Sequence, residues 1–237
     1  MTLCAKSYFQ GSKIMNNKIQ ERALAIAQHG SISKAIAAGA IEQYQDITVS
    51  EAIVLGLLNQ NVRHFFGIFG HGSTDIAEVL RIYEEHGLVK MYNVRHETAA
   101  AHAATAFGML TSEVAAVITS IGPGALHAFA GSLAFASNGV GVYHIYGDET
   151  THDEGFNMQQ IPKDEQGLFL KLCSMMGNAY ALYEPWSVTA ALKRGAVTTS
   201  LPFAQPFFLL VPMNVQPAIM RNFNLLQLPS AYKHAPV

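Results

Sequence analysis

Short apolar segments and amphipathic segments alternate along most of this chain. Apolar runs of about four to eight residues bounded by glycine, proline or polar residues are typical of buried strands, whereas apolar residues at helical spacing are typical of amphipathic helices. The first pattern predicts six strands, at residues 64–70, 89–94, 113–120, 140–147, 178–183 and 206–212. The second predicts helices between and before them, at 48–60, 73–87, 96–110, 125–139, 166–176 and 185–200.

This alternation predicts an α/β fold of three layers, in which helices cover both faces of a parallel six-stranded sheet. Before it, residues 16–45 show helical spacing with a break at Gly30-Ser31, whereas residues 1–15 show no regular pattern. We therefore expect an N-terminal helical extension at 1–45 that starts with an irregular segment. The main domain is expected at 46–217, and a C-terminal tail or the start of a linker at 218–237.

The composition narrows the function classes. Of 237 residues, 50% are hydrophobic and only 14% are charged, and the formal net charge is −2. The low charged fraction fits either a surface covered by a partner or a large core under an uncharged polar surface. No block of lysine and arginine is present, which argues against nucleic acid or an anionic membrane surface as partner.

Targeting and redox features are sparse. The longest apolar runs are too short to span a bilayer, and the N-terminus lacks the pattern of a signal peptide. The two cysteines, Cys4 and Cys173, give neither a disulfide framework nor a metal-ligand spacing. We therefore expect a cytoplasmic protein.

Four glycine-rich or polar segments follow predicted strands. In open parallel sheets, ligands bind beyond the carboxyl ends of the strands. The segments that fall there are FGHGS (69–73), RHE (95–97), SIGPG (120–124) and GDETTHDEG (147–155).

Three motifs in this region carry a family resemblance: FGIFGHGS (66–73), NVRHETAAAHAATAFG (93–108) and TSIGPGALHAFAGSLAFASNGVGV (119–142). Together they resemble the N-terminal, pyrimidine-binding domain of thiamine-diphosphate enzymes of the acetolactate synthase and pyruvate decarboxylase group. The second motif is similar to the family pattern R-H-E-x-x-A-x-x-A-A-x-x-x-A/G and is the most specific. Order and spacing agree from about residue 46 to 217. Within the group, the F-G-H-G turn and the pair Gln159-Gln160 are most similar to trihydroxycyclohexane-dione hydrolase.

The resemblance implies a role for Glu97 in activating the cofactor. Its carboxyl would hydrogen-bond N1′ of the aminopyrimidine and promote the imino tautomer, whose 4′-imino group takes the C2 proton of the thiazolium. Such a carboxyl is expected against an apolar ring, where desolvation favours the protonated form. Gly122, Pro123 and Gly124 would line the pyrimidine pocket, since glycine allows close approach of the backbone. The alternatives are an ordinary acidic residue at a helix start and a plain tight turn.

Candidate substrate contacts follow from the same resemblance. His71 matches a position from which relatives aim a polar side chain at the substrate, so it is a candidate acid, base or orienting group, or else an ordinary loop histidine. Gln159 and Gln160 would bind substrate or product oxygen atoms, because glutamine does not titrate, or else they are exposed loop residues. We interpret His96 and His102 as structural, with His96 the better candidate for contact with a partner chain.

Three other sequence features give weaker indications of a site. GDE (147–149) with Asn178 resembles the GDG…N motif that holds Mg²⁺ and diphosphate in another domain of the family. The third residue is not glycine, and the segment lies at a strand end of the pyrimidine domain, so we reject that assignment. HDE (152–154) implies no metal geometry, and we assign no metal to this chain. At His127 the family usually has asparagine.

The resemblance also implies that part of the cofactor site is supplied from outside this chain. Relatives that work as single chains are more than twice as long and carry a middle domain and a C-terminal diphosphate domain. We therefore expect a diphosphate-domain subunit, or further domains of a longer chain, to share the thiamine diphosphate in a homo- or hetero-oligomer, with Mg²⁺ on that other domain.

The expected function is that of a thiamine-diphosphate-dependent lyase, hydrolase or transferase component, inactive without this partner. It would act on C–C bonds next to a carbonyl, like a cyclic-dione hydrolase or an acetolactate synthase. One alternative is a non-catalytic binding or regulatory module that keeps the fold. Another is an unrelated nucleotide-binding domain, against which the missing GxGxxG and P-loop motifs count.

Overall fold

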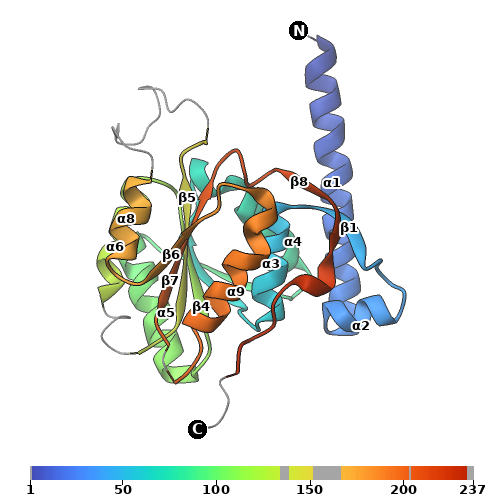
Figure 1. Ribbon diagram of the computed structural model, residues 1–237. Coiled ribbons are helices and arrows are strands. Elements are labelled where there is room, and N and C mark those ends of the chain that lie inside the picture. Colours follow the sequence, from blue (N-terminus) through green and yellow to red (C-terminus); the bar gives the residue numbers. More distant parts are fainter. Residues whose placement is uncertain (1, 134–138, 152–166, 203, 234–237) are drawn as a thin grey trace.

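The computed structural model describes residues 2–133, 139–151, 167–202 and 204–233. Its central feature is the expected parallel sheet, which lies between two layers of helices (Figure 1). The strand order is β3-β2-β4-β5-β7-β6, and every neighbouring pair is parallel. The predicted fold class is therefore confirmed.

Each of the six predicted strands is present. They are β2 (His64–Ile68), β3 (Lys90–Asn93), β4 (Ala115–Thr119), β5 (Val142–Asp148), β6 (Asn178–Ala181) and β7 (Pro206–Pro212). Strands β5 and β7 pair over seven positions and are buried along their whole length. Strands that are buried on both faces read as continuous apolar runs, and this is why the sequence pattern located them.

Two hydrophobic cores lie on opposite faces of the sheet. Neighbouring strand residues point to opposite faces, so that Phe65 belongs to one core and Phe66 to the other. The first core is covered by α3 (Val49–Asn59), α4 (Thr74–Glu85) and α9 (Val188–Thr198), which follows the short helix η2 (Pro185–Ser187). The second is covered by α5 (Glu97–Thr111), α6 (Pro123–Gly131) and α8 (Leu168–Ser174), on the other side of the sheet in Figure 1.

The N-terminal extension forms α1 (Thr2–His29) and α2 (Ile32–Ala37). The expectation of an irregular segment at 1–15 is wrong, because α1 begins at Thr2. Residues 2–15 contain one glycine and no proline, so little interrupts a helix that residues 16–29 have already nucleated. In Figure 1 the first half of α1 projects beyond the rest of the molecule.

The second half of α1 packs on the first core through a buried ion pair. Arg22, 2% exposed, donates from Nε to Glu51 Oε1 of α3 at 2.7 Å, and the Tyr83 hydroxyl of α4 donates to the same oxygen at 3.2 Å. A buried charge pair needs such additional hydrogen bonds to offset desolvation. The extension is thus held against α3 and α4 by specific polar contacts as well as by apolar packing.

A second, two-stranded sheet was not anticipated. Strand β1 (Tyr44–Thr48) pairs antiparallel with β8 (Ile219–Asn224), and the short helix η3 (Leu225–Gln227) follows. The segment that the sequence suggested as a tail or linker therefore contains a strand. Met220 and Phe223 of β8 are fully buried in the first core.

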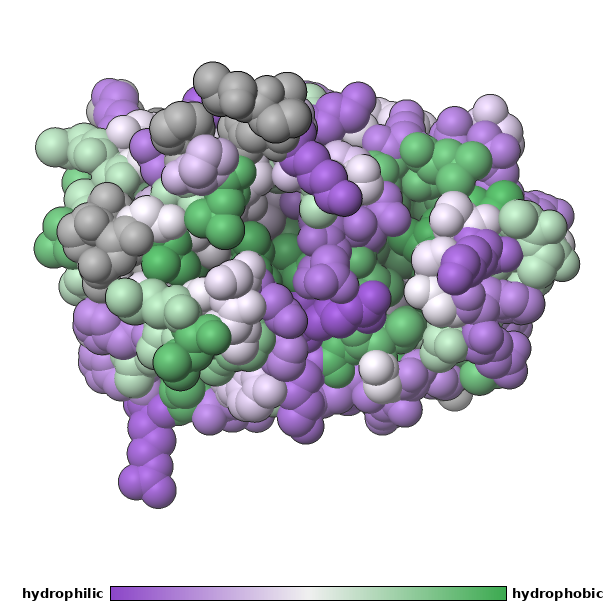
Figure 2. Space-filling model, turned by 90° about the horizontal axis from the view of Figure 1, so that it is seen from below, coloured by the Kyte–Doolittle hydropathy of each residue, from purple (hydrophilic) through white to green (hydrophobic). Residues whose placement is uncertain are grey.

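The face seen from below in Figure 1 carries hydrophobic areas that are broken up by hydrophilic side chains (Figure 2). Among the described helices, none combines the length and the apolar character needed to cross a membrane.

Candidate functional site

Two of the motif turns contact each other at the carboxyl end of the sheet. The turn after β2 forms the short helix η1 (His71–Ser73), and the backbone N–H of Gly72 donates to Ser120 Oγ after β4 at 3.1 Å. A Cβ atom at Gly70 would lie 2.9 Å from the Ser120 Cβ, so glycine permits this approach. The sequence motifs FGHGS and SIGPG are therefore joined in space.

A buried glutamine supports the first of these turns from behind. Gln216, 1% exposed, donates from Nε2 to the Gly72 carbonyl at 2.6 Å and to the Val211 carbonyl at 3.0 Å. A Cβ at Gly147 would lie only 2.1 Å from the same Gly72 oxygen. The turn is thus fixed between β5 and the segment after β7, and Gln216 is a positioning residue that the motifs did not reveal.

Glu97 is the first residue of α5. The preceding residue, His96, caps the helix by accepting the Thr98 N–H at Nδ1 over 3.3 Å. The Glu97 side chain is 16% exposed, and its Oε1 atom lies beside the turn after β4. A Cβ atom at Gly124 would stand 3.2 Å from Oε1, so the glycine leaves space directly next to the carboxyl. The structure thus brings Glu97 and Gly124 together.

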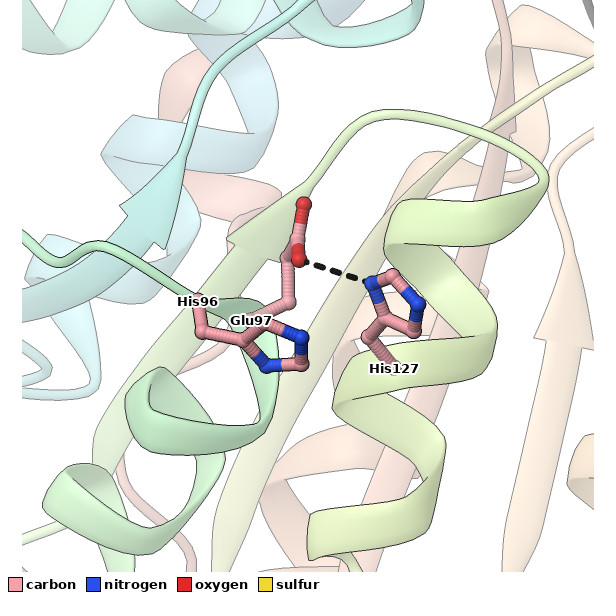
Figure 3. Close-up of side chains that lie close together, drawn as sticks. All are labelled: His96, Glu97 and His127. Atoms are coloured by element: carbon pink, nitrogen blue, oxygen red, sulfur yellow. Dashed lines mark hydrogen bonds and ion pairs between the residues drawn. The ribbon is translucent and has the colours of Figure 1, made fainter.

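The other carboxylate oxygen of Glu97 meets His127 (Figure 3). His127 Nδ1 on α6 lies 3.1 Å from Glu97 Oε2, and the imidazole donates this hydrogen bond when Nδ1 carries the proton. Thr98 Oγ1 donates to the His127 carbonyl at 2.8 Å, which fixes the two helices beside each other. The rings of His96 and His127 stack with centroids 4.6 Å apart.

The sequence treated His127 only as a departure from the family pattern. Its spacing was the available signal, because residues three apart on a helix share a face and Gly124 is three positions earlier. That spacing places the imidazole on the side of α6 that faces Glu97, where the structure finds it.

Gly122 is the position in this turn that requires glycine. Its φ of +61° lies where residues with a Cβ are disfavoured, and it precedes Pro123 at the first position of α6. Pro123 is exposed, whereas Gly122 and Gly124 are buried. The turn therefore presents backbone rather than side chains toward the carboxyl.

The other candidate residues are placed as follows. His71 lies in η1 with an exposed side chain, and His102 is exposed on α5. Among the described residues, the cluster of three potential ligands that contains Glu97 does not include His71. Gln159 and Gln160, and the HDE segment, lie outside the described residues.

The rejected Mg²⁺ motif is also separated in space. Asp148 and Glu149 are buried at the end of β5, and the Asp148 carboxylate accepts the Glu149 N–H at 2.9 Å. Asn178 lies on β6, beyond β7, where its amide donates to Thr198 Oγ1 at 3.1 Å. Nearby Cys173 is no candidate nucleophile, because burial and, to a lesser degree, Asp148 raise the pKa of its thiol to about 12.

The fold and this site define a class of protein. A carboxyl that starts one helix, beside a glycine turn that starts the next, is the arrangement implied by resemblance to pyrimidine-binding domains. Residues 47–168, just over half of the chain, match the family described as thiamine pyrophosphate enzyme, N-terminal TPP binding domain. The chain belongs to this family.

Curated relatives of this chain include acetolactate synthases and a 2-hydroxyacyl-CoA lyase. It is 34% identical over 96 residues to the acetolactate synthase large subunit of Cyanidium caldarium, and 31% identical over 111 residues to the acetolactate synthase isozyme 3 large subunit of Escherichia coli. It is also 34% identical over 87 residues to human 2-hydroxyacyl-CoA lyase 1.

The matches cover a small part of each relative. They span 40%, 47% and 37% of this chain in that order, but only 16%, 19% and 14% of the relatives. The aligned segments therefore make up less than a fifth of the length of each of these proteins.

Proposed function

We propose that this chain supplies the pyrimidine-binding half of a thiamine-diphosphate-dependent enzyme, in which Glu97 binds N1′ of the aminopyrimidine ring. The observation that carries this proposal is the position of Glu97 Oε1 beside Gly124, within two motifs of the matched family. When bound, the cofactor would supply a nucleophilic thiazolium carbon for chemistry at a substrate carbonyl.

The residues around Glu97 fit a flat ring. Gly124 lacks the Cβ that would crowd Oε1, and the backbone of Gly122 turns away with a positive φ, so space exists beside the carboxyl. A protonated carboxyl can donate a hydrogen bond to a ring nitrogen. When Nδ1 of His127 carries its proton, it donates to Oε2, which orients the carboxyl so that Oε1 faces the turn.

The remaining half of the site is assigned to another domain. A diphosphate-binding domain, on a second subunit or elsewhere in a longer chain, would hold the diphosphate and Mg²⁺. Exposed apolar side chains on the α5–α6 side of the sheet support a covered surface there: Met109 is 58% exposed, Leu110 86% and Leu133 63%.

The proposed reaction makes or breaks a C–C bond next to a carbonyl. The names of the relatives, acetolactate synthase and 2-hydroxyacyl-CoA lyase, support this class. We propose His71 as a substrate contact; its exposed position in the turn that contacts Ser120 through Gly72 supports this. Gln159 and Gln160 remain candidates for binding substrate oxygen atoms, and a cyclic-dione hydrolase remains one narrower candidate.

Replacement of Glu97 tests the proposal in the complex with a diphosphate-domain partner. We expect Glu97→Gln to lower thiamine-dependent turnover of a 2-oxo acid at least about 100-fold, because the amide cannot share the carboxyl proton. Glu113→Gln is the matched control, since Glu113 follows the same helix and is 46% exposed. Isothermal titration with thiamine diphosphate measures binding separately from turnover.

Two results would overturn the assignment. Full activity of Glu97→Gln would show that another group activates the cofactor. Absence of cofactor binding in the complex would instead favour a non-catalytic module that has kept the fold.

A further inference from the structure

The cluster of His96, Glu97 and His127 sets two imidazole rings beside the carboxyl that the proposed cofactor chemistry uses. Among the described residues, these side chains form a group of three whose potential ligand atoms all lie within 4.8 Å of one another (Figure 3). Two imidazole nitrogens and one carboxylate oxygen are borderline ligands of the kind that Zn²⁺ and similar transition-metal ions prefer. Mg²⁺ prefers oxygen ligands, so it is a poor fit to this set.

The spacing of the three groups is close to that of a tetrahedral site. Zn²⁺ binds nitrogen and oxygen at about 2.0–2.1 Å, so the ligand atoms of a tetrahedral site lie about 3.3–3.5 Å apart. His127 Nδ1 and Glu97 Oε2 are already 3.1 Å apart. Because no ligand atom is more than 4.8 Å from another, the remaining closure is at most about 1.5 Å.

The neighbouring residues allow the three ligand atoms to move closer together. His96 is exposed and the His127 side chain is 50% exposed, so both rings can turn and an ion can enter from solvent. The Thr98 hydroxyl holds the His127 backbone carbonyl, which keeps α6 in place beside α5. The ion would replace the hydrogen bond between Glu97 and His127, the long N-cap bond of His96 and the stacking of the two imidazole rings.

We propose that His96, Glu97 and His127 bind a transition-metal cation of the Zn²⁺ type, with the fourth position open to water. A metal-bound carboxylate carries no proton to share with N1′ of the pyrimidine ring, so the ion on Oε2 and the cofactor at Oε1 exclude each other. The metal site stands on the geometry alone, and only this mutual exclusion rests on the proposed function.

The test uses the 237-residue chain without cofactor. Zn²⁺ affinity is measured by competition with a chromophoric chelator, and Co²⁺ is added as a probe whose visible absorption reports tetrahedral coordination. We expect His96→Asn, Glu97→Gln and His127→Asn each to weaken Zn²⁺ binding at least about tenfold, since losing an outer-shell partner of a ligand alone costs 10–100-fold. His96→Asn retains an N-cap residue, so the helix start is preserved.

His102→Asn is the matched control, because His102 is an exposed histidine on the same helix outside the cluster. Equal Zn²⁺ binding by all four variants and the unaltered chain would overturn the site. If His96→Asn and His127→Asn lose Zn²⁺ binding but Glu97→Gln binds Zn²⁺ fully, the three-ligand assignment is overturned. Circular dichroism confirms that each variant is folded.

Exclusion is tested in the complex with the diphosphate-domain partner. Zn²⁺ at saturating concentration should raise the apparent Kd for thiamine diphosphate in the unaltered complex but not in the His127→Asn complex. An unchanged Kd would overturn exclusion. If the complex binds no cofactor, the proposed function fails, while Zn²⁺ binding by the chain alone still decides the metal site.

Discussion

At the residue scale, the site depends on glycine at position 124, which leaves the space beside Glu97 Oε1 unfilled. In Gly124→Ala the new Cβ would lie 3.2 Å from Glu97 Oε1, so the carboxyl must shift by a few tenths of an ångström. Alanine favours the helix by up to about 1 kcal/mol over glycine, so the free energy of unfolding should not fall. We expect cofactor affinity to fall about tenfold, since small misplacements of a binding group have large effects. Denaturant unfolding and cofactor titration measure the two effects separately.

The control for this prediction lies on the same helix. Ala130 is exposed near the end of α6, so Ala130→Gly reverses the change in helix propensity without approaching Glu97. It should lower stability slightly and leave cofactor affinity unchanged. Unchanged affinity in Gly124→Ala would show that the space beside Oε1 is not used by the ligand.

The site residues that could be predicted from the sequence are those that lie in contiguous motifs. Glu97 and the turn at 122–124 lie in contiguous motifs, so the sequence pattern could identify them as candidates. His127 and Gln216 act through contacts with residues 30 and 144 positions away, Glu97 and Gly72. The spacing of His127 from Gly124 indicates the face of α6 on which it lies, whereas the contacts themselves depend on how helices and turns pack in three dimensions.

At the scale of elements, the six strands of the parallel sheet could be predicted and β1 and β8 could not. The inner strands β4, β5 and β7 are buried along their whole length. In β1, by contrast, only Ile47 is buried, and β8 has an irregular pattern that includes a positive φ at Asn222. The two strands also pair across most of the chain, with Tyr44 opposite Asn224. A weak local pattern with a distant partner leaves little signal in the sequence.

Strand β8 should nevertheless contribute to the stability of the main domain. Phe223 is fully buried in the first core, so Phe223→Ala should lower the free energy of unfolding by about 3–5 kcal/mol through lost burial and an unfilled cavity. Ile219→Ala on the same strand is the control, because Ile219 is 50% exposed and should cost far less. Equal unfolding midpoints for the two variants would show that β8 is a dispensable tail.

At the scale of the whole molecule, the sheet separates two cores and holds a titratable group between its central strands. His144 lies on β5 opposite Val117 of β4 and Phe208 of β7 and is fully buried. Its Nδ1 lies 2.8 Å from the Tyr146 hydroxyl, and its ring lies 4.9 Å from that of Phe208. Burial lowers the pKa of His144 from 6.5 to about 3, so the folded protein keeps this imidazole neutral at neutral pH.

This shift makes global stability depend on pH with a defined sign. Between about pH 6.5 and pH 3 the unfolded chain binds a proton at His144 and the folded chain does not. The free energy of unfolding should therefore fall on acidification through this range, by up to about 1.4 kcal/mol per pH unit for one proton. Titration of other groups contributes as well, so the quantity to measure is the difference in slope between the unaltered chain and His144→Gln. Nuclear magnetic resonance titration of the His144 ring in the folded protein gives an independent check, and a pKa near 6.5 would contradict the prediction whatever the stability of the variants.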